Sequence, residues 1–162
     1  MNKIMMPIVF FCSIIAVSCS KSPEYVTSPG CVNTPVSSDS SALLNFATAN
    51  NIATTKDASG LYYQIITPGT GATATSTSAI EVSYKGTLLN GVVFDSTATN
   101  KTATFNLNQL IQGWQIGIPK IKAGGRIKLL VPSALAYGCA GAGSTISSNT
   151  PIFFDMILIN VK

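Results

Sequence analysis

The sequence has 162 residues, of which 46% are hydrophobic and 10% are charged, and its formal net charge at pH 7 is +4. This length suits one domain of ordinary size, and the hydrophobic fraction is large enough for a buried core. The absence of histidine excludes Ser-His and Cys-His catalytic arrangements and His-based zinc sites, and no run of Lys and Arg indicates a nucleic-acid partner.

The first 18 residues are typical of an export signal. Lys3 supplies a positive charge, an almost wholly apolar run extends from Ile4 to Val17, and small residues precede Cys19. The run is shorter than the roughly 20 residues that a membrane-spanning helix needs, so an export signal is the better interpretation.

A cysteine directly after small residues resembles the lipobox of bacterial lipoproteins, in which that cysteine becomes the first residue of the mature chain and carries a lipid. We therefore predict a lipoprotein signal peptide at residues 1–18 and a lipid on Cys19. This predicts a membrane-anchored protein of the cell envelope, in the periplasm or at the outer membrane. Ala16 and Val17 depart from the usual motif, and Ala16-x-Ser18 also suits ordinary signal peptidase, so a secreted soluble protein is the alternative.

Residues 19–59 are predicted to form a tether with one short helix. The segment 20–38 is rich in Ser, Thr and Pro, as linkers often are. From Asp39 to Asn50 apolar residues recur at helical spacing, and Asp39 or Ser40 is placed to cap the helix.

From Gly60 to Lys162 the pattern is mainly that of strands. Asn90-Gly91 is the strongest hairpin signal in the chain. A short helix is expected from Asn108 to Ile116, with Asn108 as its cap. These elements predict an α+β domain in which an antiparallel sheet wraps over one short helix. The expected strands cover residues 61–66, 80–85, 92–95, 102–107, 126–131 and 152–161.

A series of short motifs in this domain resembles FKBP-type peptidyl-prolyl cis–trans isomerases, in the order and close to the spacing of that family. The resemblance covers residues 60–162 and, with the lipobox, points to the bacterial lipoproteins of the family. It implies a half-open antiparallel sheet curled around one short helix. The motifs are Val82-Ser83-Tyr84-Lys85-Gly86, Leu89-Asn90-Gly91, Val93-Phe94-Asp95-Ser96, Phe105-Asn106-Leu107, Leu110-Ile111-x-Gly113-Trp114, Ala136-Tyr137-Gly138 and Ile152-Phe153-Phe154-Asp155.

The resemblance also implies a proline-binding pocket with Trp114 as its floor. Asp95, Tyr137 and Phe94 are the predicted catalytic residues, and the Ile111 N–H and the Tyr137 hydroxyl are expected to bond substrate carbonyls. Without the resemblance, the aromatic residues would be interpreted as ordinary core. The predicted substrate-binding residues are Tyr84, Phe105, Leu110, Ile111, Trp114, Ile146 and Phe154.

The function implied is acceleration of X-Pro isomerisation in exported or envelope proteins. Rotation about an amide breaks no bond, so neither a cofactor nor a metal is expected. The expected partners are proline-containing polypeptides that are unfolded or folding, the membrane through the lipid on Cys19, and macrolide inhibitors, with a monomeric protein. Ala142 and Thr145 replace larger side chains of the family, which predicts a more open and flexible rim, altered substrate preference and weaker inhibitor binding. The alternative function is a non-catalytic proline-segment binding module or holdase chaperone.

Two further cysteines, Cys31 and Cys139, remain after the signal peptide and Cys19 are set aside. In an oxidising compartment they could pair and attach the tether to the domain. Two free thiols are the alternative, because a bridge requires Cα atoms within about 7 Å.

Overall fold

The computed structural model describes residues 30–162. The predicted signal peptide at 1–18 and the predicted lipid attachment site Cys19 lie outside the described residues. One compact unit extends from Cys31 to Lys162. Within the described residues, no helix has the length and apolar character needed to cross a membrane.

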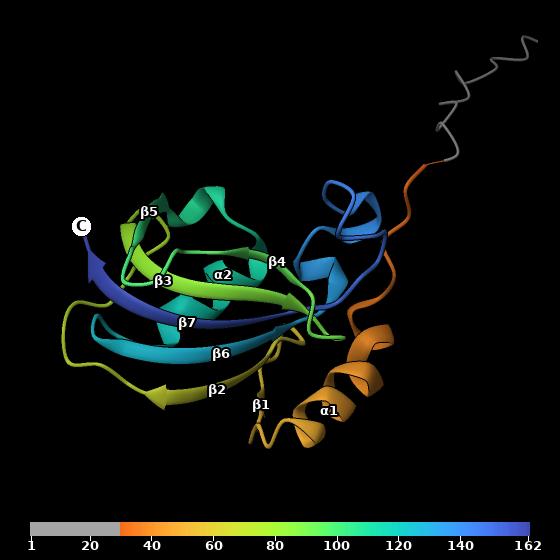
Figure 1. Ribbon diagram of the computed structural model, residues 1–162, viewed down its shortest axis with the longest axis horizontal. Helices are drawn as coiled ribbons and strands as arrows, with labels where there is room; N and C mark the ends of the chain where they lie inside the picture. Colours follow the sequence, from red (N-terminus) through yellow and green to blue (C-terminus); the bar gives the residue numbers. More distant parts are fainter. Residues whose placement is uncertain (1–29) are drawn as a thin grey trace, which may run out of the picture. The chain divides into compact units, whose positions relative to one another are not determined.

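The centre of the fold is a seven-stranded antiparallel sheet, in which neighbours follow the order β1-β2-β6-β7-β3-β4, while β5 also pairs with β3 (Figure 1). The predicted strands are confirmed with ends shifted by a few residues, and β1 is an additional two-residue strand that the sequence pattern did not indicate. The strands are β1 (Thr55–Lys56), β2 (Tyr62–Thr67), β3 (Ala79–Leu88), β4 (Val93–Ser96), β5 (Ala103–Asn106), β6 (Gly125–Val131) and β7 (Ile152–Val161).

Strand β3 changes partner along one of its edges. On one side it pairs with β7 from Ile80 to Leu88. On the other side β5 pairs with the beginning of β3 and β4 with its end. Between these two short strands, the Tyr84 N–H donates to the Thr97 hydroxyl and the Thr97 N–H donates to the Tyr84 carbonyl. The main chain of Tyr84 is therefore satisfied by a loop residue rather than by a strand.

The inner face of the sheet is the main core. Along β7 alternate residues are buried, including Phe154 and Met156, as the two-residue period of a strand requires. Helix α2 (Gln112–Gly117) packs against β6 on this face. Gly113 and Gly117 allow a close approach, because a Cβ at Gly117 would lie 2.6 Å from the Cδ2 atom of Leu129.

The predicted helix from Asn108 to Ile116 is interrupted in the structure. A 3-10 turn η2 (Leu107–Gln109) comes first, and α2 begins only at Gln112 with Ile111 as its N-cap residue. Leu110 and Ile111 between them have extended backbone conformations. Asn108 therefore does not cap α2, because two extended residues separate it from the helix. A second 3-10 turn, η3 (Ile118–Lys120), follows α2 directly.

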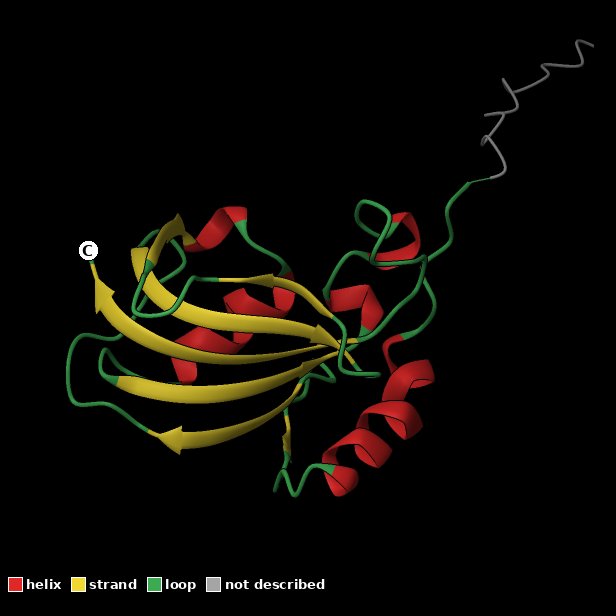
Figure 2. Cartoon of the chain, in the orientation of Figure 1, coloured by secondary structure: helices red, strands yellow, loops and turns green. Residues whose placement is uncertain are grey.

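The outer face of the sheet is covered in part by helix α1 (Ser40–Ala49), which confirms the predicted short helix. Leu43 and Ala47 are buried in a second apolar cluster with Tyr62 and Leu130, and Phe46 packs on Phe153 with ring centroids 5.2 Å apart. Figure 2 shows α1 apart from the helical turns on the inner side of the sheet.

The segment before Gly60 is attached to the domain from Cys31 onward, because α1 has an apolar face to bury and the residues before it bond to distant loops. Preceding α1, the 3-10 turn η1 (Val36–Asp39) ends in a buried Asp39. Asp39 was expected to cap α1, but its side chain makes no capping bond and instead accepts hydrogen bonds from Ser133. The structured unit thus begins before the predicted boundary at residue 60. Two 3-10 turns, η4 (Ser133–Leu135) and η5 (Gly138–Ala140), lie between β6 and β7.

Candidate functional site

A cavity of about 110 Å³ opens beside α2 on the inner side of the sheet. Every residue that lines it is among the residues predicted for the site. They come from β3, β4, β5, β7, the segment before α2, α2 itself and the loop between β6 and β7. The lining residues are Tyr84, Asp95, Phe105, Leu110, Ile111, Trp114, Tyr137 and Phe154.

The remaining two predicted residues, Phe94 and Ile146, lie in an adjoining hollow. This hollow of about 310 Å³ shares Asp95 and Tyr137 with the cavity and is completed by small residues of the loop between β6 and β7. Another hollow, of about 480 Å³, shares Phe105 and Leu110 on the β5 side. The small cavity therefore lies between two open hollows, which is a shape that can hold a chain with one side group inserted.

Trp114 is surrounded by aromatic rings that stand nearly perpendicular to it. Its ring centroid is 5.0 Å from that of Tyr84, 5.1 Å from that of Phe154 and 6.2 Å from that of Phe105, with interplanar angles of 83°, 85° and 84°. Edge-to-face packing of this kind is favourable for aromatic pairs and holds the side chains rigidly. Only 4% of the Trp114 surface is exposed. The arrangement forms an aromatic socket with an almost fully buried floor.

The indole N–H of Trp114 has no hydrogen-bond partner within residues 30–162, and it is the one buried side-chain polar atom of that range in this situation. A buried donor without an acceptor is unfavourable by about 1–3 kcal/mol. The indole edge of Trp114 is therefore enclosed within the described part of the fold, and its N–H is left without an acceptor there.

Tyr84 and Asp95 form the polar wall of the cavity. The Tyr84 hydroxyl donates to Asp95 Oδ2 at 2.6 Å, from β3 to the adjacent β4. Burial, and then the hydrogen bond to Asp95, raises the pKa of Tyr84, so its hydroxyl stays protonated at physiological pH. This contact keeps the exposed carboxylate of Asp95 in one orientation beside the aromatic socket. Phe94, the neighbour of Asp95 in β4, packs edge-on against Phe154 with centroids 5.5 Å apart.

Two donors at the cavity have no acceptor in the described part of the chain: the Ile111 main-chain N–H and the Tyr137 hydroxyl. Burial, followed by the negative charge of Asp95, raises the pKa of Tyr137, so this hydroxyl also remains a donor. Both groups are free to bond carbonyl oxygens of a bound molecule.

Gln115 supports the site and was not predicted. Its Nε2 donates to the Leu110 carbonyl at 2.6 Å, from the second turn of α2 back to the extended segment. This bond holds the main chain at Leu110 and Ile111 in place. No local pattern marks Gln115, because its role depends on the interruption between η2 and α2.

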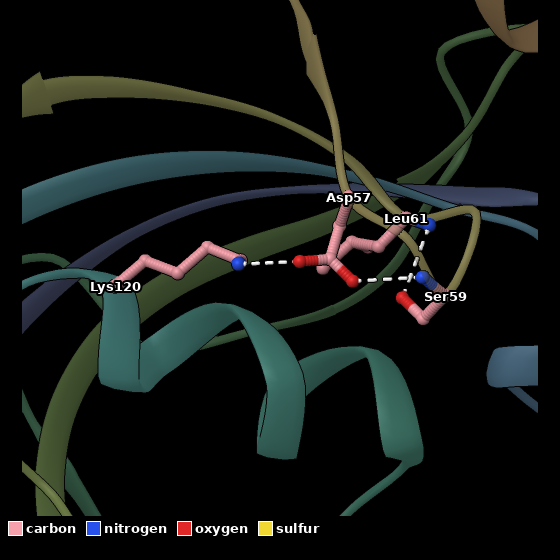
Figure 3. A network of polar contacts seen from close by, with 4 residues as sticks. All are labelled: Asp57, Ser59, Leu61 and Lys120. Carbon is pink, nitrogen blue, oxygen red and sulfur yellow. Dashed lines mark hydrogen bonds and ion pairs between the residues drawn. The ribbon is translucent and has the colours of Figure 1, made fainter.

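A second support acts at the other end of α2 (Figure 3). Lys120 Nζ lies 2.6 Å from Asp57 Oδ2 and 4.8 Å from the Tyr63 ring centroid. Asp57 also accepts the Ser59 N–H at 2.9 Å. The hydrogen bond from Lys120 is the largest cause that lowers the pKa of Asp57, well below its ordinary range. The carboxylate therefore joins the turn η3, which directly follows the helix that carries Trp114, to the loop between β1 and β2.

A larger hollow of about 430 Å³ lies on the outer face of the sheet, but its character is different. It is lined mainly by hydroxyl and charged side chains, and Arg126 and Asp155 in it form a two-contact ion pair with N–O distances of 2.8 and 2.7 Å. It has no aromatic socket, so the small cavity is the better candidate site. Within residues 30–162 no group of acidic or cysteine side chains is arranged to hold a metal ion.

A half-open antiparallel sheet curled around a short helix, with an aromatic socket on its inner side, defines the class of protein to which this chain belongs. The comparison with family models identifies it: residues 71–159 match the family of FKBP-type peptidyl-prolyl cis-trans isomerases. The chain belongs to this family, as the sequence motifs predicted.

Individual relatives agree with this assignment. The chain is 39% identical over 118 residues to a probable FKBP-type peptidyl-prolyl cis-trans isomerase of Haemophilus influenzae, covering 72% of this chain and 48% of the relative. It is 43% identical over 105 residues to the outer membrane protein MIP of Legionella longbeachae, covering 64% and 45%. The crystal structure of FkpA from Escherichia coli is similar with a TM-score of 0.70 and 35% identity, covering 78% of this chain and 58% of that one. The chain thus spans about half the length of these curated relatives.

Proposed function

We propose that the protein is a peptidyl-prolyl cis–trans isomerase that acts on X-Pro bonds of polypeptides. The observation that carries the proposal is the combination in one small cavity of an aromatic socket, an oriented carboxylate and two unpaired donors. Membership of the FKBP-type family supports it. The two open hollows beside the cavity favour a polypeptide substrate over a small molecule, because chain can extend on either side of an inserted ring.

The socket suits the prolyl ring and the energetics of rotation. The barrier to rotation about a peptide bond is about 18–20 kcal/mol, and it arises from resonance that makes the planar amide polar. Twisting the amide removes this charge separation. A pocket with little water therefore disfavours the planar ground state more than the twisted transition state, and that difference lowers the barrier. Trp114 and the rings around it provide this environment and pack against the pyrrolidine.

The polar groups select the twisted geometry. In this proposal the Ile111 N–H and the Tyr137 hydroxyl donate to substrate carbonyl oxygens on either side of the prolyl ring. Asp95, oriented by Tyr84, faces the amide whose charge distribution changes during rotation. Groups fixed before the reaction stabilise such a change without further reorganisation. Neither a nucleophile nor a proton transfer is required.

The deciding experiment measures the cis–trans exchange rate of a short proline peptide with wild type and two pocket variants. Wild type is expected to accelerate exchange, and Asp95→Ala and Phe94→Ala are expected to reduce kcat/KM by about tenfold or more, equivalent to about 1.4 kcal/mol. Asp155→Asn, which alters a carboxylate on the outer face of the sheet, is the matched control and should retain wild-type rates. Peptide binding without acceleration by wild type would instead indicate a non-catalytic binding module or holdase.

We further propose that the protein works in the cell envelope, attached to a membrane by a lipid on Cys19. The order of charged, apolar and small residues before Cys19 supports this, and so does the similarity to a relative named outer membrane protein MIP. Mass spectrometry of the mature protein tests the anchor. A lipid on Cys19 is expected, whereas an unmodified N-terminus would favour the secreted alternative.

Macrolide inhibitors are proposed to enter the same cavity. Ala142 and Thr145 line the adjoining hollow with side chains that offer little contact area. The proposal is therefore weak binding, which titration with a macrolide would measure. A Thr145→Tyr variant, which restores a large side chain at the rim, is expected to bind more tightly.

A further inference from the structure

The wall of the cavity formed by Tyr137 and Ile146 lies in a long loop, and one segment of chain holds that loop in place. The loop runs from Ser133 to Asn149, between β6 and β7. The segment, residues 31–39, precedes α1 and is here called the strap. A disulfide, hydrogen bonds and packing join strap and loop, and they are described below. None of these contacts is part of the strand pairing of the sheet.

The first end of the strap is bonded covalently to the loop. Cys31 forms a disulfide with Cys139, with 5.1 Å between their Cα atoms and 108 residues between them in the sequence. Cys139 is two residues after Tyr137. A covalent joint so close to Tyr137 limits how far that side chain can move from the cavity.

Next to the disulfide, Asn33 is fitted to the loop by shape and by hydrogen bonding. Its Oδ1 accepts the Cys139 N–H at 2.8 Å. Its side chain lies against Gly138, where an added Cβ would come 3.1 Å from the Asn33 Cγ atom. Gly138 also has a φ of +55°, a conformation that glycine adopts without strain. Asn33 of the strap therefore packs directly against Gly138, the residue after Tyr137.

Asn149, at the end of the loop, forms hydrogen bonds both to another residue of the loop and to the strap. Its N–H donates to the Gly138 carbonyl at 2.8 Å, so the end of the loop returns to the residue that follows Tyr137. Its side-chain Oδ1 accepts the Thr34 N–H, and its Nδ2 donates to the Val32 carbonyl, each at 3.3 Å. One side chain thus joins the loop to two main-chain groups of the strap.

The second end of the strap is fixed in the interior. Asp39 Oδ2 accepts both the N–H and the hydroxyl of Ser133 at 2.7 Å, and both residues are buried. Val36 packs against the main core, and α1 follows at once on the outer face of the sheet. The strap is therefore anchored in the body of the domain at one end and bonded to the loop at the other.

We infer that the strap is a positioning element for the site: Cys31, Asn33 and Asp39 hold the loop so that Tyr137 and Ile146 complete the cavity, and release of the strap weakens substrate binding. The inference rests on the proposed function, but its test measures peptide binding and does not require catalysis. When only a fraction of molecules has the binding-competent loop, the apparent Kd rises by the inverse of that fraction. Trp114, Phe154 and Tyr84 are held by ring contacts with one another and by the Tyr84–Asp95 hydrogen bond, so the socket itself remains when the strap is released.

The test uses binding of a short proline peptide, followed by the fluorescence of Trp114, which is the sole tryptophan in the sequence and lies in the cavity. The peptide Kd of the full chain is compared before and after treatment with dithiothreitol. The reductant transfers two electrons and two protons to the disulfide, giving thiols on Cys31 and Cys139, and leaves as its own cyclic disulfide. Reduction is expected to raise the peptide Kd about fivefold, which corresponds to a competent fraction of about one fifth.

Variants separate positioning from general loss of structure. Cys31→Ser is expected to show the raised Kd without reductant and no further response to it. Asn33→Ala should raise the Kd about threefold, whereas Asn33→Asp keeps an acceptor oxygen and should stay within about twofold of wild type.

Thr102→Val removes an exposed hydrogen bond to Glu81 far from the strap and serves as the control, with an unchanged Kd. Faster hydrogen exchange at the Cys139 and Asn149 N–H groups should accompany each rise in Kd, with an unchanged near-UV spectrum of the core.

The inference is overturned if reduced wild type and Cys31→Ser bind the peptide as oxidised wild type does, or if Asn33→Asp loses as much affinity as Asn33→Ala. It is also overturned if kcat falls while KM and Kd stay constant, because loop release should act on binding. Failure of the proposed function has a different signature: peptide binding that depends on the strap, with no acceleration of exchange by wild type.

Discussion

The socket and the rim of the candidate site are held by different means. The socket consists of Trp114, Phe154 and Tyr84, which belong to α2, β7 and β3 and pack within the main core. The rim consists of Tyr137 and Ile146, which lie in a loop joined to the rest of the chain by the strap. The socket therefore depends on folding of the whole domain, while the rim can change without it. This difference orders the effects expected of substitutions.

The largest effect is expected in the socket, from Phe154→Ala. Phe154 is 2% exposed and packs against Trp114 and Phe94, so truncation should lower the free energy of unfolding by about 3–5 kcal/mol and abolish peptide binding. Phe153→Ala is the matched control on the same strand, because Phe153 faces outward onto Phe46 of α1. It should lower stability by about 1–2 kcal/mol and leave binding intact. Urea unfolding and Trp114 fluorescence measure both, and equal losses for the two variants would contradict the distinction.

The next effect is expected at the anchor of the rim, from Asp39→Ala. This change leaves the buried N–H and hydroxyl of Ser133 without their acceptor and should lower the free energy of unfolding by about 2–3 kcal/mol. Asp39→Asn retains an acceptor oxygen, so its loss should be smaller. Denaturant unfolding gives the stabilities. A stable Asp39→Ala protein with tight peptide binding would show that the rim does not need this anchor.

A smaller effect is expected from Asp57→Asn, which removes the ion pair between the loop after β1 and the end of α2. The pKa of Asp57 is lowered in the folded state, so its stabilisation is present above the unfolded pKa of about 4 and is lost as the pH falls below that value. At pH 7 the variant should be less stable by about 1 kcal/mol, a value typical of partly exposed pairs. The difference should shrink on acidification from pH 4 towards pH 2, as thermal unfolding at several pH values would show. A gap that widens in acid would reject this account.

The smallest effect is expected from alkaline pH. The pKa values of Tyr84 and Tyr137 are both raised, so both hydroxyls stay protonated where an ordinary tyrosine, with a pKa of about 10, begins to ionise. Peptide binding should therefore be nearly constant from pH 7 to about pH 9.5. Absorbance titration at the phenolate band should show Tyr84 and Tyr137 ionising late. Tyr84→Phe and Tyr137→Phe would assign the two late transitions, and early ionisation of either residue would oppose the proposed donor role.

Much of the socket could be predicted from sequence, because its residues occur in short motifs whose order and spacing resemble those of a known family. Trp114, Tyr84 and Phe154 are large side chains within regular elements, and their apolar character alone indicates only an ordinary core. The motif series then supplied their register, and the structure brings all the predicted residues of the site to the cavity or to the hollow beside it.

The supports of the site could not be predicted, because their partners are far apart in the sequence. Asp39 before α1 has the local pattern of a helix cap, yet its partner Ser133 is 94 residues away. The break between η2 and α2 is similar, since Leu110 and Ile111 have helical spacing but take an extended conformation that Gln115 then secures. Local pattern cannot distinguish these outcomes, because the deciding contacts are tertiary.

The change of partner along β3 also has a consequence for the proposed function, in which the protein meets unfolded chains. Long strand edges with free N–H and carbonyl groups capture extended backbone of other molecules and promote aggregation. Here β5, the bonds between Tyr84 and Thr97, and β4 occupy that edge in succession. In the proposed function, a polypeptide that reaches the cavity beside Tyr84 therefore meets side chains rather than free main-chain groups of β3.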